Sequence, residues 1–197
     1  MRRNKMRQKN LYAAIAIAIC LALLGVLPVL AGQFYGTEGN DIITGTNNSD
    51  YINGASGNDT LTGLEGSDQI WGGAGQDLIH GNNGNDHLSG GTGRDRIFGD
   101  SGVDLISGDI GPDQLHGGSG DDFIHGGNGK DTLWGDDGND KLYGDADNDK
   151  ILGNAGNDRI YGGPGADVLI GGPGYDICYA DPADRVVDCE IVYGRLP

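Results

Sequence analysis

A nine-residue period runs without insertion or deletion from Gly36 to Tyr179, a span of 144 residues or sixteen units. The first place of every unit is glycine, and the sixth place of every unit is aspartate. The fourth place is glycine in fourteen units, with Asn48 and Asp147 as exceptions, and the eighth place is Ile or Leu in fifteen, with Cys178 as the exception. Self-similarity at a short fixed period is typical of chains that stack small units into a solenoid.

Each unit reads as a tight turn followed by a very short strand. Glycine at the first and fourth places allows the positive φ angles of a turn, which Asn and Asp also tolerate. Places seven to nine form a triplet whose middle residue is apolar, as in a strand with one face inward. Two units with strands on opposite sides close one eighteen-residue coil. The sequence therefore predicts an all-β, β-helix-type solenoid of sixteen nine-residue repeats, with eight coils stacked at about 4.8 Å into a rod of roughly 38 Å.

The first 32 residues form a segment of their own. The first ten positions hold five basic residues and no acidic one, and an apolar run follows from Leu11 to Ala31. This order predicts an export signal peptide over residues 1–32, cleaved after Ala31 or Gly32. An uncleaved anchor is the alternative, because about twenty apolar residues cross a bilayer once. We expect the remaining chain to be secreted, extracellular or held at the cell surface, with no stable membrane insertion if the leader is cleaved.

Beyond the leader the chain is strongly acidic. All 29 Asp and Glu residues follow position 32, but only eight of the 13 Lys and Arg do, so this part carries a formal charge of −21. Such a charge repels nucleic acid and anionic membranes, and we expect neither as a partner. An acid at the sixth place of every unit argues against a merely solvated acidic tail.

Several units match one consensus at every fixed place, among them GGTGRDRIF from Gly90, GGSGDDFIH from Gly117, GGNGKDTLW from Gly126 and GGPGADVLI from Gly162. They resemble the GGxGxDxUx nonapeptide of RTX proteins, the hemolysin-type calcium-binding repeats. The resemblance implies a parallel β-roll over residues 33–179, with several Ca²⁺ ions held between the turn of one unit and the turn two units later. The implied ligands are turn carbonyls and the sixth-place aspartates, namely Asp41, Asp50, Asp59, Asp68, Asp77, Asp86, Asp95, Asp104, Asp113, Asp122, Asp131, Asp140, Asp149, Asp158, Asp167 and Asp176.

The residues themselves also favour Ca²⁺. One aliphatic side chain per unit makes a thin core, and stacking brings like-charged aspartates into register, so a cation between the rungs would offset their repulsion. Carboxylate and carbonyl oxygens in a flexible turn suit Ca²⁺ better than Mg²⁺, and no Cys/His cluster indicates zinc or copper. Sixteen units offer at most fourteen positions between units two apart. We expect fewer to be filled and place the calcium-binding centre at residues 72–179, because the first four second places read Thr37, Thr46, Ala55 and Leu64.

Residues 180–197 break the period and are expected to cap the roll. The stretch VVDCEIVY reads as a strand that covers the last rung. Cys178 replaces the aliphatic residue of the last unit, and Cys189 follows eleven residues later. In one interpretation the two form a disulfide after export that ties the cap to the roll, and in the other they remain reduced and buried.

The sequence does not indicate an enzyme, because it lacks HExxH and GxSxG motifs and has no segment outside the repeats that suits a catalytic domain. We expect a secreted calcium-binding repeat protein that folds on binding several Ca²⁺ ions. The alternative is a Ca²⁺-dependent adhesion module that binds cell-surface glycans or matrix proteins through outward aromatic ladders, unless the stacked rings only shield the sheet. An ice-binding roll fits poorly, since Thr92 is the only threonine at a third place. The two ladders are His125, Tyr143, Tyr161 and Tyr179, and His80, Phe98, His116 and Trp134.

Overall fold

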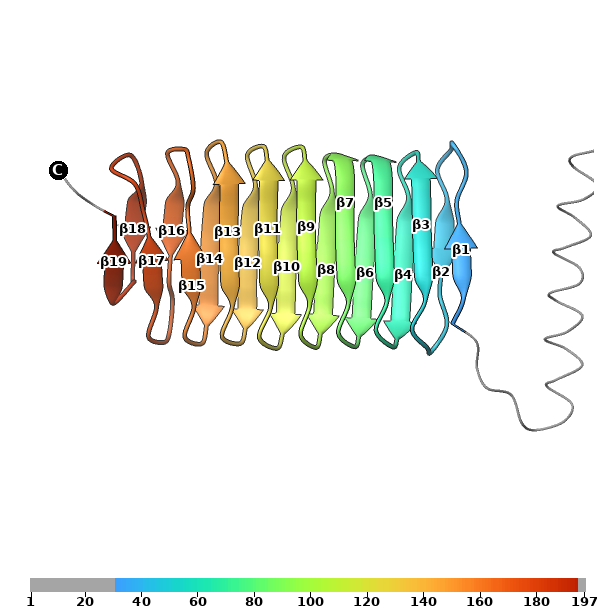
Figure 1. Cartoon of the computed structure of the whole chain (residues 1–197), viewed down its shortest axis with the longest axis horizontal. Helices are drawn as coiled ribbons and strands as arrows, with labels where there is room; N and C mark the ends of the chain where they lie inside the picture. The colour runs from blue at the N-terminus through green and yellow to red at the C-terminus, as the bar shows by residue number, and fades with distance from the viewer. Residues whose placement is uncertain (1–30, 195–197) are drawn as a thin grey trace, which may run out of the picture. The chain divides into compact units, whose positions relative to one another are not determined.

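The computed structural model describes residues 31–194, so the predicted leader lies outside the described residues except for its last two positions. The described residues form two parallel β-sheets that lie one behind the other, with no helix in this range (Figure 1). The ten-stranded odd sheet contains β1 (Gln33–Tyr35), β3 (Tyr51–Ser56), β5 (Gln69–Gly75), β7 (His87–Gly93), β9 (Leu105–Ile110), β11 (Phe123–Asn128), β13 (Lys141–Ala146), β15 (Arg159–Tyr161), β17 (Ile177–Tyr179) and β19 (Ile191–Tyr193). The nine-stranded even sheet contains β2 (Ile42–Thr44), β4 (Thr60–Glu65), β6 (Leu78–Asn83), β8 (Arg96–Ser101), β10 (Gln114–Ser119), β12 (Thr132–Asp137), β14 (Lys150–Ala155), β16 (Val168–Ile170) and β18 (Arg185–Val187).

Successive strands alternate between the sheets, so each coil takes two units. Within a sheet, neighbouring repeat strands pair in parallel at an offset of eighteen residues. Leu115 in β10, for example, lies opposite Ile97 in β8 and Leu133 in β12. This register confirms the predicted parallel β-roll. The roll is longer than the sixteen units, because β1 precedes the first unit and β18 and β19 follow the last.

The core consists of the eighth-place residues, which point between the two sheets. From Ile52 to Cys178 each of them has 0% of its surface exposed. At the ends of the roll, Phe34, Ile43 and Val186 pack against this core and are only partly buried. Burial of one aliphatic side chain stabilises the fold by about 1.5–3 kcal/mol. The core is therefore continuous along the roll but only one side chain deep on each sheet.

The strands from β3 to β14 are longer than the predicted triplet. They have six or seven residues and run from the seventh place of one unit into the turn of the next. In the β10–β12 pair, the ladder includes His116 with Trp134 and Gly118 with Asp136, but not Gly117, because the chain bends at the first place. The second-place residue after the bend has positive φ, as at Asp136 (69°), which Gly, Asn and Asp adopt most readily.

The predicted three-residue length is found only near the ends of the roll. The strands β15 and β16 end before units whose third place is Pro164 or Pro173. Proline has no N–H to donate to a ladder, so the strand does not continue through it. The strands β1 and β2 also have three residues, and the units that follow them have threonine at the second place, Thr37 and Thr46.

The prediction of one terminal strand from VVDCEIVY was wrong. The structure divides this stretch between β18, which pairs with β16, and β19, which pairs with β17. The two strands are separated by a turn that begins at Asp188, where φ is 51°. Each sheet therefore gains one parallel strand from the segment that follows the repeats.

Candidate metal-binding turns

The turns line the two long edges of the roll, where the chain passes from one sheet to the other (Figure 1). Turns of odd-numbered units lie along one edge and those of even-numbered units along the other, so the sixth-place aspartates form two columns. Every aspartate of these columns from Asp50 to Asp176 is buried, with at most 4% of its surface exposed. Asp41, in the first unit, is half-buried. The structure thus brings the aspartates predicted as ligands into two aligned rows.

One oxygen of each carboxylate links neighbouring coils. The backbone N–H of Asp95 donates to Oδ1 of Asp113 at 2.7 Å, and that of Asp104 donates to Oδ1 of Asp122 at 2.8 Å. The same bond recurs at every step from Asp41, which donates to Asp59, to Asp158, which donates to Asp176. Burial of these carboxylates is therefore partly offset by one N–H donor each.

The second oxygen of fourteen of these carboxylates is buried and has no hydrogen-bond partner among residues 31–194. Leaving a buried acceptor unpaired costs about 1–3 kcal/mol, and more for a charged group. Native structures seldom leave such a row unsatisfied, which points to a ligand. We call these atoms the inner oxygens. They are Oδ2 of Asp59, Asp68, Asp77, Asp86, Asp95, Asp104, Asp113, Asp122, Asp131, Asp140, Asp149, Asp158, Asp167 and Asp176.

Each inner oxygen lies beside the first-place glycine of its own unit. A Cβ atom placed on Gly126 would lie 2.7 Å from Oδ2 of Asp131 and 2.7 Å from the carbonyl oxygen of Gly144, two units later. At Gly108 the corresponding distances to Asp113 and to the Gly126 carbonyl are both 2.6 Å. A carboxylate oxygen and a carbonyl oxygen therefore approach the same small space. Any side chain at the first place would fill this space, which explains why all sixteen residues there are glycine.

The electrostatics of the columns oppose a row of bare carboxylates. The pKa of Asp140 is raised to about 8, mainly by burial; the N–H of Asp122 opposes the shift, and repulsion from Asp158 and Asp122 adds to it. The pKa of Asp104, Asp113 and Asp149 rises to about 7 for the same reasons. Burial also raises the pKa to about 6 at Asp68, Asp86, Asp95, Asp122, Asp131 and Asp158. A nearby cation would favour the ionised form and reverse these shifts.

The available donors are hard oxygens. Within residues 31–194, no three His, Cys, Asp or Glu side chains converge as a metal-binding group, so a cation in the turns must take carbonyl ligands as well as carboxylates. Mixed carboxylate and carbonyl donors in a turn are the ligand set of Ca²⁺, which accepts six to eight oxygens with flexible geometry. The residues beside the first-place glycines therefore fit this ion in chemistry.

The first two turns satisfy their aspartates differently. The Thr46 N–H and hydroxyl donate to Oδ2 of Asp50 at 2.5 and 2.9 Å. Thr37 makes the same two bonds to Oδ2 of Asp41, at 2.6 and 2.9 Å. From the sequence we predicted that the four turns with Thr37, Thr46, Ala55 and Leu64 at the second place lie outside the calcium-binding centre. In the structure only the threonine turns lack an inner oxygen, since the row begins at Asp59 in the Ala55 turn.

Sequence reasoning missed two residues that end the aspartate columns. The N–H of Asp167 donates to Oδ1 of Asp184 at 2.9 Å, and the N–H of Asp176 donates to Oε2 of Glu190 at 2.6 Å. A sequence signal for both exists, because DRVV from Asp184 and EIVY from Glu190 repeat the acid-x-aliphatic-x end of a unit. The turns before them are shortened, so a strict period of nine does not reach them.

The structure joins Cys178 and Cys189 by a disulfide, with their Cα atoms 6.1 Å apart. Cys178 is fully buried in the core, and Cys189 lies next to Glu190. The bond therefore connects the last core position of the repeats to the turn between β18 and β19.

The second-place aspartates face outward and do not belong to the buried columns. Asp136 and Asp145 lie within hydrogen-bond distance of histidines on the outer strand faces: Oδ2 of Asp136 lies 3.1 Å from His116 Nδ1, and Oδ2 of Asp145 lies 2.8 Å from His125 Nδ1. Asp100 contacts His80 in the same way at 3.1 Å. These acids therefore pair with side chains of the outer faces.

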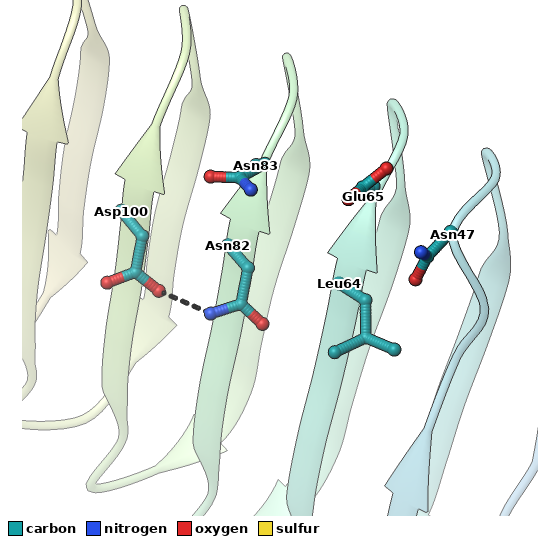
Figure 2. A pocket seen from close by; sticks show the side chains of 6 residues that line it. All are labelled: Asn47, Leu64, Glu65, Asn82, Asn83 and Asp100. Carbon is teal, nitrogen blue, oxygen red and sulfur yellow. Dashed lines mark hydrogen bonds between the residues drawn. The ribbon is translucent and has the colours of Figure 1, made fainter.

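A shallow hollow on the even-unit edge is lined by second- and third-place side chains (Figure 2). Leu64 lies among polar groups there, and the Asn82 amide donates to Oδ2 of Asp100 at 3.2 Å. The first-place glycines do not line this hollow, which presents mainly amide and carboxylate groups. Its lining residues are Asn47, Leu64, Glu65, Asn82, Asn83 and Asp100.

Both predicted aromatic ladders are stacked. Ring centroids from His125 through Tyr143 and Tyr161 to Tyr179 are 4.3–4.6 Å apart with interplanar angles of 3–5°, and Tyr193 extends this ladder at 5.2 Å. In the second ladder, His80, Phe98, His116 and Trp134 stack at 4.1–5.0 Å. Interior rings cover each other's faces, so mainly their edges face outward. This arrangement supports the interpretation that the ladders shield the sheets.

No helix in residues 31–194 is long and apolar enough to span a membrane.

The comparison with protein families finds a model described as RTX calcium-binding nonapeptide repeat (4 copies), which matches residues 33–61, 53–88, 80–115, 107–142, 116–151 and 143–178. Together these matches cover residues 33–178 without a gap. The comparison with curated proteins finds no match.

Proposed function

Because the chain belongs to the RTX calcium-binding nonapeptide repeat family, we propose that it is an exported, non-catalytic protein whose roll forms when several Ca²⁺ ions bind between its turns. The observation that carries this proposal is the row of fourteen inner oxygens. Each is a carboxylate oxygen withdrawn from water, and most of them share the space beside the glycine with a backbone carbonyl oxygen. A chain without cations in these turns has to desolvate the charges or protonate them.

The residues that would hold Ca²⁺ are the aspartates that carry inner oxygens and the first-place glycines two units later. The N–H bond to Oδ1 orients each carboxylate, so that its Oδ2 stays beside the glycine. The glycine itself leaves the space that a side chain would fill. Bound Ca²⁺ supplies a double positive charge and accepts six to eight oxygen ligands. Asp41 and Asp50 were also predicted as ligands, and their threonine partners argue for a different role.

Export fits the calcium dependence of such a fold. Extracellular calcium modules bind with dissociation constants of about 10⁻⁴–10⁻³ M. This binding is much weaker than that of calcium proteins that act inside cells. A chain of this charge stays unfolded while calcium is scarce and orders where calcium is abundant. The basic and apolar leader supports export through a signal peptide. The disulfide between Cys178 and Cys189 is consistent with an oxidising exterior.

Far-UV circular dichroism of the full chain during a Ca²⁺ titration, with Mg²⁺ as the matched control, tests the proposal. We expect a cooperative change from coil to β-sheet with Ca²⁺ and little change with Mg²⁺ at the same concentration. A chain that is already β-sheet in chelator at neutral pH would overturn the proposal, since its turns would then be stable without the ion.

Calcium-dependent association with cell-surface glycans or matrix proteins is the second candidate. Tyr193, which ends one ladder at the last rung, is 50% exposed and favours this alternative. The stacked interior rings disfavour sugar binding on their faces, so contact would involve ring edges and the terminal ring. Retention of the calcium-loaded chain on cell-wall material, lost on adding chelator and in Tyr193→Ala, would support association. If the calcium-loaded chain and the chelated chain are retained equally on cell-wall material, the association is contradicted.

A further inference from the structure

The segment that follows the repeats enters the turns at the last rung on each edge. In a regular turn, two oxygens approach the first-place glycine: Oδ2 of its own aspartate and the glycine carbonyl two units later. The fifteenth and sixteenth units have no repeat two units later. Their first-place glycines, Gly162 and Gly171, nevertheless have two oxygens beside them.

At Gly162 the second oxygen comes from a carboxylate. A Cβ atom there would lie 2.6 Å from Oδ2 of Asp167 and 2.9 Å from Oδ2 of Asp184. Asp184 is 4% exposed, and its Oδ1 accepts the Asp167 N–H at 2.9 Å, as a sixth-place aspartate would. Its Oδ2 also accepts the Asp181 N–H at 2.8 Å. Two buried carboxylate oxygens therefore approach the same space, where like charges repel and a cation between them would be favoured.

At Gly171 the second oxygen is a carbonyl. A Cβ atom there would lie 2.5 Å from Oδ2 of Asp176 and in contact with the carbonyl oxygen of Asp188. Glu190 accepts the Asp176 N–H and so takes the orienting part of the next aspartate in this column. The disulfide at Cys189 anchors the turn that contains both residues. Asp167 and Asp176 both carry inner oxygens, and each is at most 1% exposed.

We propose that Asp184, through its carboxylate, and Asp188, through its carbonyl, complete the last divalent-cation position on each edge of the roll. Both residues lie outside the nine-residue period. Glu190 is a positioning residue for the second of these positions. The proposal rests on the proposed calcium function and extends it to the segment beyond the repeats. It also changes where these positions lie, of which the sequence offers at most fourteen: the first two turns are closed by threonine, and the last two are completed by the cap.

The experiment counts the Ca²⁺ ions bound per full chain at saturation, by equilibrium dialysis followed by metal analysis. Asp184→Asn keeps an acceptor for the Asp167 N–H and removes one carboxylate. We expect this variant to bind one ion fewer than the natural chain. Asp181→Asn makes the same charge change three residues away, where Oδ1 of Asp181 accepts the Ala183 N–H, and we expect it to bind the full number.

The outcomes separate the two proposals. If the natural chain binds no Ca²⁺, the proposed function fails. If the natural chain binds Ca²⁺ and Asp184→Asn binds the same number, Asp184 is a structural cap residue and this inference is overturned. If Asp184→Asn loses several ions together, Asp184→Glu decides. Recovery of the ions with the longer carboxylate supports ligation, and no recovery counts against it.

Discussion

In the first two units, a second-place threonine donates to the aspartate oxygen that, from Asp59 to Asp176, has no hydrogen-bond partner among residues 31–194. The backbone differs together with the side chain. Second-place residues from Ala55 onward have positive φ, whereas Thr37 and Thr46 do not. In every turn Oδ2 of the aspartate lies beside the first-place glycine. In the threonine turns this oxygen accepts hydrogen bonds from the second-place residue, and in the later turns it has no donor among residues 31–194.

The contrast teaches that the buried aspartate alone does not make a cation position. Both kinds of turn use Oδ1 to link coils, as Asp50 does for Gly32 and Asp59 does for Asp41. For the carboxylate, the difference between them is whether a donor reaches Oδ2. With two donors from threonine the turn is complete without metal, so we expect the start of the roll to tolerate low calcium better than its centre.

Acidification is expected to produce the largest difference between the two regions. Burial raises the pKa of Asp140 to about 8 and of Asp104 to about 7, from an ordinary value of 3.8. A carboxyl whose pKa is higher in the folded chain favours folding when protonated. In chelator this contribution is complete below pH 3.8 and is lost as the pH rises through about 8. We therefore expect the calcium-free chain to gain β-sheet dichroism on going from about pH 8.5 to pH 4, as the row of central carboxyls becomes neutral.

Calcium should show the opposite trend, because protons compete with it for the same carboxylates. Its apparent affinity is expected to fall as the pH is lowered from 8 to 6, the range of the shifted pKa values of the central aspartates. If the calcium-free chain has the same circular dichroism spectrum at about pH 8.5 and at pH 4, these aspartates are not the source of its instability.

A first-place glycine in the centre should be less replaceable than a glycine in the first turn. In Gly126→Ala the new Cβ would meet Oδ2 of Asp131 and the Gly144 carbonyl, both at 2.7 Å, so the backbone must shift. We expect a loss of about 1–3 kcal/mol in unfolding free energy at saturating calcium. In Gly39→Ala the nearest atom, Oγ1 of Thr37, is 3.9 Å away, and the change should stay within about 0.5 kcal/mol. Equal losses in urea unfolding would refute the difference.

Replacing an aspartate by asparagine separates the two kinds of turn by ion count. Asp131→Asn keeps an acceptor for the Asp113 N–H and removes the inner oxygen's charge. We expect it to bind at least one ion fewer and to fold at a roughly tenfold higher calcium concentration, which corresponds to about 1.4 kcal/mol. Asp50→Asn disturbs its bonds to Thr46 but should leave the ion count unchanged. Titration calorimetry of both variants decides, and a lost ion in Asp50→Asn would place a cation in the second turn.

The regular part of the fold could be predicted from the sequence because every unit has the same residue pattern and therefore the same local structure. A glycine at the first place, an aspartate at the sixth and an aliphatic residue at the eighth are enough to indicate a turn, a buried acid and an inward strand residue. The parallel register then follows from a coil of two units. The division of each carboxylate into a linking Oδ1 and an inner Oδ2 could not be predicted, because it depends on the direction of the N–H in the adjacent coil.

The ends of the roll were harder to predict because the period fails there. Asp184 follows Asp167 by seventeen residues and Glu190 follows Asp176 by fourteen, where the repeats have eighteen. Register counting therefore missed both, and VVDCEIVY looked like one strand. At the other end, Thr46 and Leu64 both departed from the usual second-place residues, and only side-chain geometry distinguished the hydroxyl that reaches Oδ2 from the alkyl group that does not.

The smallest expected effect tests what closes the threonine turn. Thr46→Val keeps a side chain of similar shape and leaves the backbone N–H bond to Asp50, but it removes the hydroxyl donor. We expect a loss of about 1 kcal/mol in unfolding free energy without a change in bound calcium. Thr132→Val, at a seventh place on β12, serves as the control for a threonine exchange outside the turns. If Thr46→Val gains an ion instead, the hydroxyl rather than the backbone of the turn excludes the cation, and the first two units differ from the others by a single donor.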